Sequence, residues 1–169
     1  MLMEELSKDD FTNANFEFAN SKFILIDDVK IWTQRLSYVG ELGYELYINI
    51  KDAKKIYEKI IEKGKKFYLS NCGMHALDTM RMECGFLHWG HDISPEENQY
   101  QSGLDFTISF KKKVDFIGKE ALTKLKEKKP DKKFSMFVLK NNEPGKPLIL
   151  HDEPIYLEDK IIGRTTSGN

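Results

Sequence analysis

The chain has 169 residues, of which 40% are hydrophobic and 12% aromatic, which is enough apolar material for a folded core and is not typical of a disordered segment. Its 26 basic and 27 acidic residues leave a net charge of -1. We therefore expect no nucleic-acid partner, because nucleic-acid binders concentrate positive charge. The two cysteines, Cys72 and Cys84, are too few for a disulfide framework and favour a reducing compartment.

The first ten residues, MLMEELSKDD, are acidic and lack the basic and apolar regions of a signal or transit peptide. No window approaches the roughly 20 apolar residues of a membrane span. We expect a cytoplasmic chain with no membrane partner.

Residues 23–38 are rich in β-branched and aromatic side chains and predict two strands joined by a turn at Asp27-Asp28. The second strand is expected to continue through a glycine-punctuated turn, Gly40 to Gly43, into a further strand over 44–50. The period of two then places Glu45 on the face opposite the core, together with Tyr47 and Asn49, whereas Tyr44, Leu46, Ile48 and Ile50 face inward.

Three helices follow in chain order. The first is expected from an N-cap at Asp52 to Gly64, because its apolar residues recur at spacings of three and four. The second is predicted over about 74–83, capped by Ser70 or Asn71 and stopped near Gly85. The third, about 119–128, ends before a proline, which cannot continue a helix.

From Phe134 onward the pattern predicts short strands: FSMFVL, PLIL, and a hairpin in PIYLEDKIIGRTTSGN that turns at Glu158-Asp159. The expected fold class is α+β, a mixed or antiparallel sheet with helices followed by the start of a C-terminal β-barrel. We place the domains at 1–128 and 129–169. The second has too few strands to close a sheet, so we expect both it and the chain to be partial.

Metal and nucleophile chemistry have weak signals. Cys84, His88, His91 and Asp92 lie close in sequence, but their spacing is not a strong zinc signature, so no metal is expected. A Cys72 or Cys84 nucleophile paired with His75 is also weak, because helical cysteines are usually small buried hydrophobes.

Glu45 is the sharper candidate. A carboxylate beside aromatic rings suits the amine and ring N–H edge of a pterin or guanine, since two oxygens accept two protons while rings pack the faces. A solvated strand face is the alternative, and the pattern alone leaves both open.

Four segments carry a family resemblance: YVGELGYELYI at 38–48, GMHALDTMRMECGFLHWGHDISPEENQYQSGLDF at 73–106, KKVDFIGKEAL at 112–122 and GRTTSGN at 163–169. Together they resemble the folate-dependent aminomethyltransferases, including the T-protein of glycine cleavage. HALDTMRMECGFLHWGHD and LMEELSKDDFTNANFEF look closer to the folate-binding portion of dimethylglycine and sarcosine dehydrogenases.

The resemblance implies a tetrahydrofolate pocket and one-carbon transfer to that cofactor from an aminomethyl or N-methyl amine donor. It assigns folate binding to Tyr38 and Glu45, with Glu41 as the rival carboxylate and Arg81 and Trp89 as pocket-lining candidates. For Arg81 the alternative is a surface ion pair with Asp78 or Glu83, and for Trp89 it is core packing. Leu77 stands where free T-proteins carry arginine, which favours the dehydrogenase-linked branch and a flavin dehydrogenase domain in the parent protein.

The family's catalytic aspartate belongs to an N-terminal lobe whose motif is not found in residues 1–30. We therefore assign no catalytic residue and expect the isolated chain to be weakly active or inactive. The contrasting expectation is a non-catalytic binding or assembly module that keeps the family scaffold and forms homo-oligomers.

Overall fold

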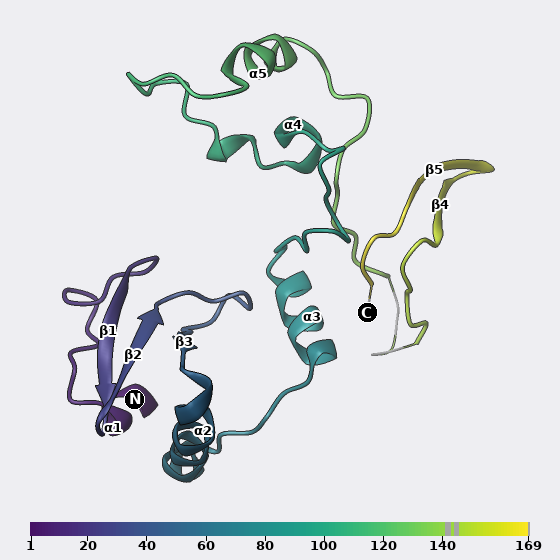
Figure 1. Cartoon of the computed structure of the whole chain (residues 1–169). Coiled ribbons are helices and arrows are strands. Elements are labelled where there is room, and N and C mark those ends of the chain that lie inside the picture. The colour runs from purple at the N-terminus through teal and green to yellow at the C-terminus, as the bar shows by residue number, and fades with distance from the viewer. Residues whose placement is uncertain (141–142, 144–145, 169) are drawn as a thin grey trace. The chain divides into compact units, whose positions relative to one another are not determined.

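The structure is a computed structural model that describes residues 1–140, 143 and 146–168. The chain forms two compact units, residues 1–86 and 87–169. Both helices and antiparallel sheets are present (Figure 1), which confirms the α+β class. Within the described ranges, no helix is long and apolar enough to cross a bilayer.

The first unit is built on an antiparallel sheet with strand order β1-β2-β3. Strand β1 (Ser21–Ile26) and strand β2 (Val29–Gln34) form a hairpin, which confirms the predicted turn at Asp27-Asp28. Strand β3 (Glu45–Tyr47) pairs with β2. The same unit contains α1 (Leu2–Leu6), α2 (Ile50–Gly64), the short 3-10 helix η1 (Lys65–Phe67) and α3 (Met74–Glu83).

One face of this sheet forms the core. Ile24, Ile26 and Ile31 point inward and are at most 1% exposed, because alternate residues of a strand share a face. Helices α1 and α2 supply the other side, and the core cluster comprises Met3, Leu6, Phe11, Phe16, Ile24, Ile26, Ile31 and Ile56. Tyr44, Leu46 and Ile48 pack against it as expected.

Two expectations for this region were wrong. Ile50 is 91% exposed because it begins α2 rather than ending a strand, and the helix cap is Asn49, whose side chain accepts from the Lys51 N–H at 3.2 Å. Asp52 instead lies in the first turn, where a carboxylate stabilises the positive end of the helix dipole.

The second strand also ends earlier than predicted, at Gln34, and does not continue over residues 35–38 to the glycine turn. Gln34 pairs with Glu45, so residues 35–44 form a loop. Gly40 has φ +76° and lies so close to the Cys84 sulfur that a Cβ would collide with it. Cys84 also donates from Sγ to the Val39 carbonyl at 3.3 Å. The glycine therefore serves close packing against the end of α3 rather than a tight hairpin turn.

Helix α3 spans the predicted residues, but its N-cap is Gly73, with no side-chain hydrogen bond, rather than Ser70 or Asn71. The second unit contains α4 (Gln99–Ser102), the 3-10 helix η2 (Asp105–Thr107), α5 (Lys119–Lys126) and a hairpin of β4 (Pro154–Leu157) and β5 (Lys160–Arg164). Helix α5 ends at Lys126, slightly earlier than predicted.

The hairpin turn at Glu158-Asp159 is confirmed, and Glu158 takes a positive φ of 53°. FSMFVL and PLIL, by contrast, form no strands, and the described residues form no closed barrel. β-branched and aromatic content favours a strand only where a partner strand accepts its hydrogen bonds. At the start of the 134–139 segment, the Phe134 N–H instead donates to the carbonyl of Gln101, which lies in α4, at 2.7 Å.

Glu97 ties part of the second unit together and gives a pH prediction. It accepts from Lys132 Nζ at 2.6 Å and from the Ser94 hydroxyl at 2.7 Å, and these bonds, Lys132 first, lower the pKa of Glu97 to about 2. The ionised carboxylate therefore stabilises the folded unit at pH values above 4.5, the ordinary pKa of a glutamate. This stabilisation is lost as the pH falls through about 2.

We expect a carboxyl titration followed by NMR to place Glu97 at about 2, and Lys132→Met to raise its pKa toward 4.5. Glu127→Gln, an exposed carboxylate of the same unit, is the control and should leave the Glu97 titration unchanged. An ordinary Glu97 pKa in the wild-type chain would contradict the Lys132 contact.

Candidate functional site

Glu45 begins β3 and lies on the sheet face opposite the core, as the alternation predicted. Its side chain is exposed, and one carboxylate oxygen accepts from the Tyr47 hydroxyl at 2.7 Å. The same hydrogen bond raises the pKa of Tyr47, because ionising the phenol beside a carboxylate is unfavourable. Glu45 is therefore an accessible carboxylate held by its own strand.

Tyr47 is the contact that sequence reasoning missed, although it was placed on the correct face. Residues two apart on a strand point the same way, so the signal was present in the spacing. The Tyr47 ring also packs on Trp32 with ring centroids 4.7 Å apart. Glu45 thus sits at one side of an aromatic pair, an arrangement suited to a flat heterocycle with donor groups on its edge.

Tyr38 and Glu41 both lie on the loop 35–44 that leads into Glu45. The Tyr38 ring is 37% exposed and lies parallel to Phe86, with centroids 6.3 Å apart and an interplanar angle of 8°. Glu41 is exposed in the same loop. The loop therefore presents one partly exposed aromatic ring and one carboxylate ahead of β3.

Arg81 is the buried member of the predicted set, only 3% exposed. Its Nε donates to Asp78 and its Nη1 to the Phe86 carbonyl, both at 3.2 Å. The ion pair with Asp78 was one of the expected alternatives, but it is not on the surface as that alternative assumed. Through Phe86, the guanidinium fixes the residue on which Tyr38 stacks.

Trp89 belongs to the second unit and is 65% exposed, so core packing does not describe it. It lies in a tight turn where Gly90 N–H donates to the Ile93 carbonyl at 2.8 Å. The structure thus groups Tyr38, Glu41, Glu45 and Arg81 in one unit and places Trp89 in the other.

Asp92, weighed earlier as a weak metal ligand, has a different role. It is 6% exposed and accepts from the His88 N–H at 2.8 Å, the Thr166 hydroxyl at 2.5 Å and the Ser167 hydroxyl at 2.7 Å. Two of the resembling segments, GHD and TTSG, therefore meet within the second unit. Asn169, which ends the resembling segment 163–169, lies outside the described residues.

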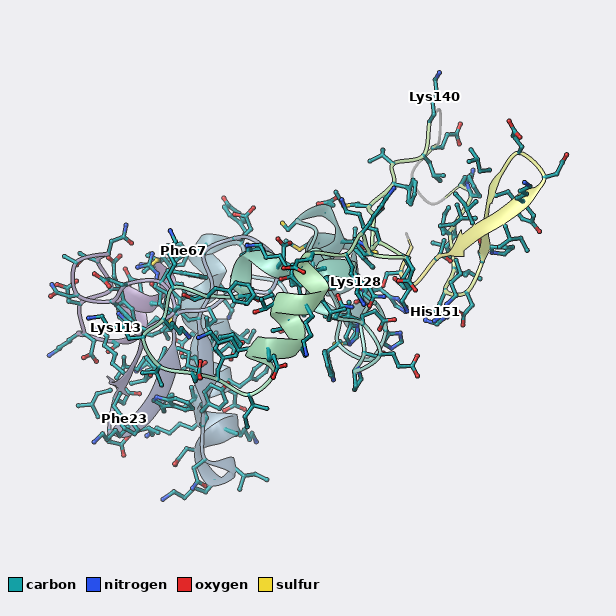
Figure 2. All side chains as sticks on the ribbon, turned by 90° about the horizontal axis from the view of Figure 1, so that it is seen from above. Phe23, Phe67, Lys113, Lys128, Lys140 and His151 are labelled. Carbon is teal, nitrogen blue, oxygen red and sulfur yellow. The ribbon has the colours of Figure 1, made fainter. Side chains whose placement is uncertain are left out.

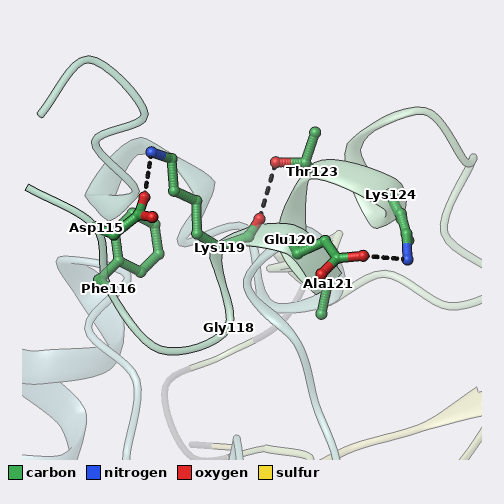
Figure 3. A pocket seen from close by; sticks show the side chains of 8 residues that line it. All are labelled: Asp115, Phe116, Gly118, Lys119, Glu120, Ala121, Thr123 and Lys124. Atoms are coloured by element: carbon green, nitrogen blue, oxygen red, sulfur yellow. Dashed lines mark hydrogen bonds and ion pairs between the residues drawn. The ribbon is translucent and has the colours of Figure 1, made fainter. Parts of the chain in front are cut away.

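Among the residues the structure describes, no group of three or more His, Cys, Asp or Glu is arranged to hold a metal ion. An open hollow at the start of α5 is lined by Asp115, Phe116, Gly118, Lys119, Glu120, Ala121, Thr123 and Lys124 (Figure 3). Its charges are paired with each other, Lys119 with Asp115 and Lys124 with Glu120, each at 2.6 Å. This hollow is therefore a weaker ligand candidate than the Glu45 face.

The comparisons with known proteins agree with the resemblance. Residues 1–112 match the family model described as the GCVT N-terminal domain. The chain is 38% identical over 168 residues to 4-methylaminobutanoate oxidase (formaldehyde-forming) of Paenarthrobacter nicotinovorans, covering 99% of the chain and 20% of that protein. It is 32% identical to mitochondrial dimethylglycine dehydrogenase of Rattus norvegicus, covering 99% of the chain and 19% of that enzyme.

An aminomethyltransferase of Alkaliphilus metalliredigens is 33% identical over 167 residues, which are 99% of the chain and 44% of that protein. The chain therefore spans about a fifth of the two oxidising enzymes and less than half of the aminomethyltransferase.

Proposed function

Because this chain belongs to the GCVT N-terminal domain family, we propose that it binds tetrahydrofolate and that Glu45 receives the amine and ring N–H of the pterin. The observation that carries the proposal is the exposed Glu45 carboxylate, fixed by the Tyr47 hydroxyl at 2.7 Å and flanked by the aromatic pair. A carboxylate accepts charge-assisted hydrogen bonds from such an edge, and aromatic rings cover the flat faces.

The remaining candidate residues of the first unit also suit a flat ligand such as a pterin. Tyr38 offers a partly exposed ring for stacking, and buried Arg81, ion-paired with Asp78, supports that ring through its hydrogen bond to the Phe86 carbonyl. We assign Arg81 to positioning and keep Glu41 as the rival carboxylate. Trp89, exposed in the second unit, stays a folate-binding candidate by the family resemblance alone.

When bound, tetrahydrofolate supplies the nitrogen nucleophile that accepts a one-carbon unit. This chain's contribution is to bind and orient the pterin, and we assign no general acid or base in it. Such a group contributes on the order of 100- to 10,000-fold, so we propose that the isolated chain is a weak or inactive transferase. The names of the relatives support an aminomethyl or N-methyl amine as the donor and an oxidase or dehydrogenase part in a longer parent. That this part is a flavin dehydrogenase domain is what the family resemblance implies.

We also propose a division into 1–128 and 129–169, which keeps the whole family match, residues 1–112, within the first part. A cytoplasmic location is supported by Cys72 and Cys84, both free and exposed. Limited proteolysis tests the division, because cleavage should concentrate near Pro130, between α5 and the segment that follows it.

The binding proposal is tested by titration calorimetry of 5-formyltetrahydrofolate, a stable analogue, into the 169-residue chain. We expect saturable binding that Glu45→Ala weakens by about 30-fold or more, since it removes the acceptor of a charge-assisted pair. Glu62→Ala, an exposed carboxylate on α2, is the matched control and should bind like wild type.

Glu41→Ala separates the two candidate carboxylates and should change affinity by no more than about threefold, as for a solvated surface charge. A larger loss in Glu41→Ala than in Glu45→Ala would transfer the role to Glu41. No binding to a folded wild-type chain would contradict the proposed function itself.

A second candidate function, an assembly module, is favoured by a specific feature of the same sheet. Its outer face exposes the large apolar side chains of Phe23, Leu25, Trp32 and Tyr47, whereas a strand face in contact with water usually carries polar residues.

A further inference from the structure

The outer face of the β1-β2-β3 sheet is apolar at its centre. Phe23 is 58% exposed, Leu25 55%, Trp32 37% and Tyr47 49%, and Phe23 is labelled in Figure 2. An antiparallel sheet with one packed face normally turns polar residues to water on the other. We call this surface the aromatic face and define it by Phe23, Leu25, Lys30, Trp32, Glu45 and Tyr47.

The strand register arranges these residues in rows. Phe23 pairs with Trp32, and Trp32 pairs with Tyr47, so three aromatic side chains cross the sheet in one line. Aromatic residues of this kind dominate interface energetics because they combine a large apolar area with few rotatable bonds. A contiguous row of them marks an interaction surface rather than scattered exposed hydrophobes.

Opposite charges flank the row. Glu45 pairs with Gln34 on one side of it, and Lys30 pairs with Leu25 on the other. The Lys30 ammonium lies over the Phe23 ring, 4.5 Å from its centroid, so the positive charge borders the aromatic row. The face is thus negative at one end, apolar in the middle and positive at the other end.

This pattern is complementary to itself. A two-fold axis that lies along the aromatic row between two facing sheets places the Glu45 side of one copy over the Lys30 side of the other. Glu45 and the partner's Lys30 are then one strand apart, about 5 Å sideways, with sheets about 10 Å apart. Both side chains are long enough to span that separation. We infer that the aromatic face binds a second copy of this chain as an isologous dimer.

Glu45 belongs to both the proposed folate site and this dimer interface, so the dimer covers the carboxylate that the pterin would use. Dimer formation is therefore measured without folate. If no dimer forms, the calorimetric result on folate binding is unaffected.

The test is sedimentation velocity of the full 169-residue chain from about 1 µM to about 1 mM, the range in which modest interfaces associate. We expect a concentration-dependent monomer–dimer equilibrium. Trp32→Thr should weaken it by about 30-fold or more, since it removes the central aromatic anchor from an exposed position. Circular dichroism confirms that the variant remains folded.

Charge reversal tests the orientation. Lys30→Glu and Glu45→Lys should each weaken the dimer by about tenfold, because like charges then face each other. The double variant restores opposite signs and should return the dissociation constant to within about threefold of wild type. Lys51→Glu, an exposed charge reversal on α2, is the matched control and should not affect association.

A wild-type chain that stays monomeric over the whole range would overturn the proposal, as would a dimer that neither single reversal weakens. Loss of association in both singles without recovery in the double would overturn the proposed two-fold arrangement.

Discussion

Replacing Phe16 with alanine should destabilise the first unit by about 3 to 5 kcal/mol, the usual cost of removing a fully buried aromatic ring. Phe16 is 2% exposed, and its ring centroid lies 6.1 Å from Phe11 and 5.6 Å from Tyr44. Phe11 and Tyr44 are themselves in edge contact at 5.6 Å. The substitution therefore opens a cavity among three mutually packed rings in a unit of only 86 residues.

The measurement is urea unfolding in a Trp89→Phe background, where Trp32 becomes the only tryptophan and reports on the first unit. Phe18→Ala is the matched control, because Phe18 lies two residues away and is 70% exposed. It should cost less than about 0.5 kcal/mol. A Phe16→Ala chain as stable as Phe18→Ala would show that the three rings do not form the core of this unit.

The elements that sequence reasoning placed well are those set by local pattern. The β1-β2 hairpin follows from alternation around Asp27-Asp28, α3 covers Met74–Glu83 as predicted, and the face of Glu45 follows from a period of two. Each of these depends on residues close in sequence, so the chain itself contains the information.

The failures depend on partners far away in sequence. Gly40 looks like a hairpin turn residue, but what requires a glycine there is the close approach of Cys84, 44 positions later. FSMFVL has strand composition but no partner strand among the described residues, so it forms none. Composition gives a segment a preference for strand or turn, but contacts with residues distant in sequence decide whether the segment adopts it.

The candidate site divides in the same way. Glu45 was found from alternation and its Tyr47 partner could have been found from the same spacing, whereas the Arg81–Phe86–Tyr38 chain of contacts requires α3 to lie beside the 35–44 loop. The sequence suggested a surface ion pair for Arg81, because the helix alone does not reveal that its guanidinium is buried.

The expected result for Asp92→Ala is a loss of about 3 kcal/mol in the stability of the second unit. The residue is 6% exposed, and its carboxylate accepts hydrogen bonds from the His88 N–H and from the Thr166 and Ser167 hydroxyls. Hydrogen bonds to a buried charge are worth about 1.5 to 3 kcal/mol each, and they are not additive within one network. Removal of the acceptor also takes away the Asp92 bond of the Thr166 hydroxyl, the Ser167 hydroxyl and the His88 N–H.

Contacts on the other side of the C-terminal segment explain why the loss of stability should be concentrated there. The Thr165 hydroxyl donates to the Leu150 carbonyl at 2.6 Å, and a Cβ on Gly168 would collide with Ile149, so residues 165–168 are held closely between Ile149-Leu150 and Asp92. Without Asp92, one side of this arrangement is lost. Amide protons of Thr166 and Ser167 should then exchange faster with solvent, while those of α5 change little.

Thermal unfolding in a Trp32→Phe background measures the effect, since Trp89 then reports on the second unit alone. Asp159→Asn, in the exposed β4-β5 turn, is the matched control and should cost less than about 0.5 kcal/mol. Thr166→Val combined with Ser167→Ala should reproduce only part of the Asp92→Ala loss, because the His88 N–H bond remains. Equal stability of Asp92→Ala and Asp159→Asn would mean that the meeting of the GHD and TTSG segments does not stabilise the unit.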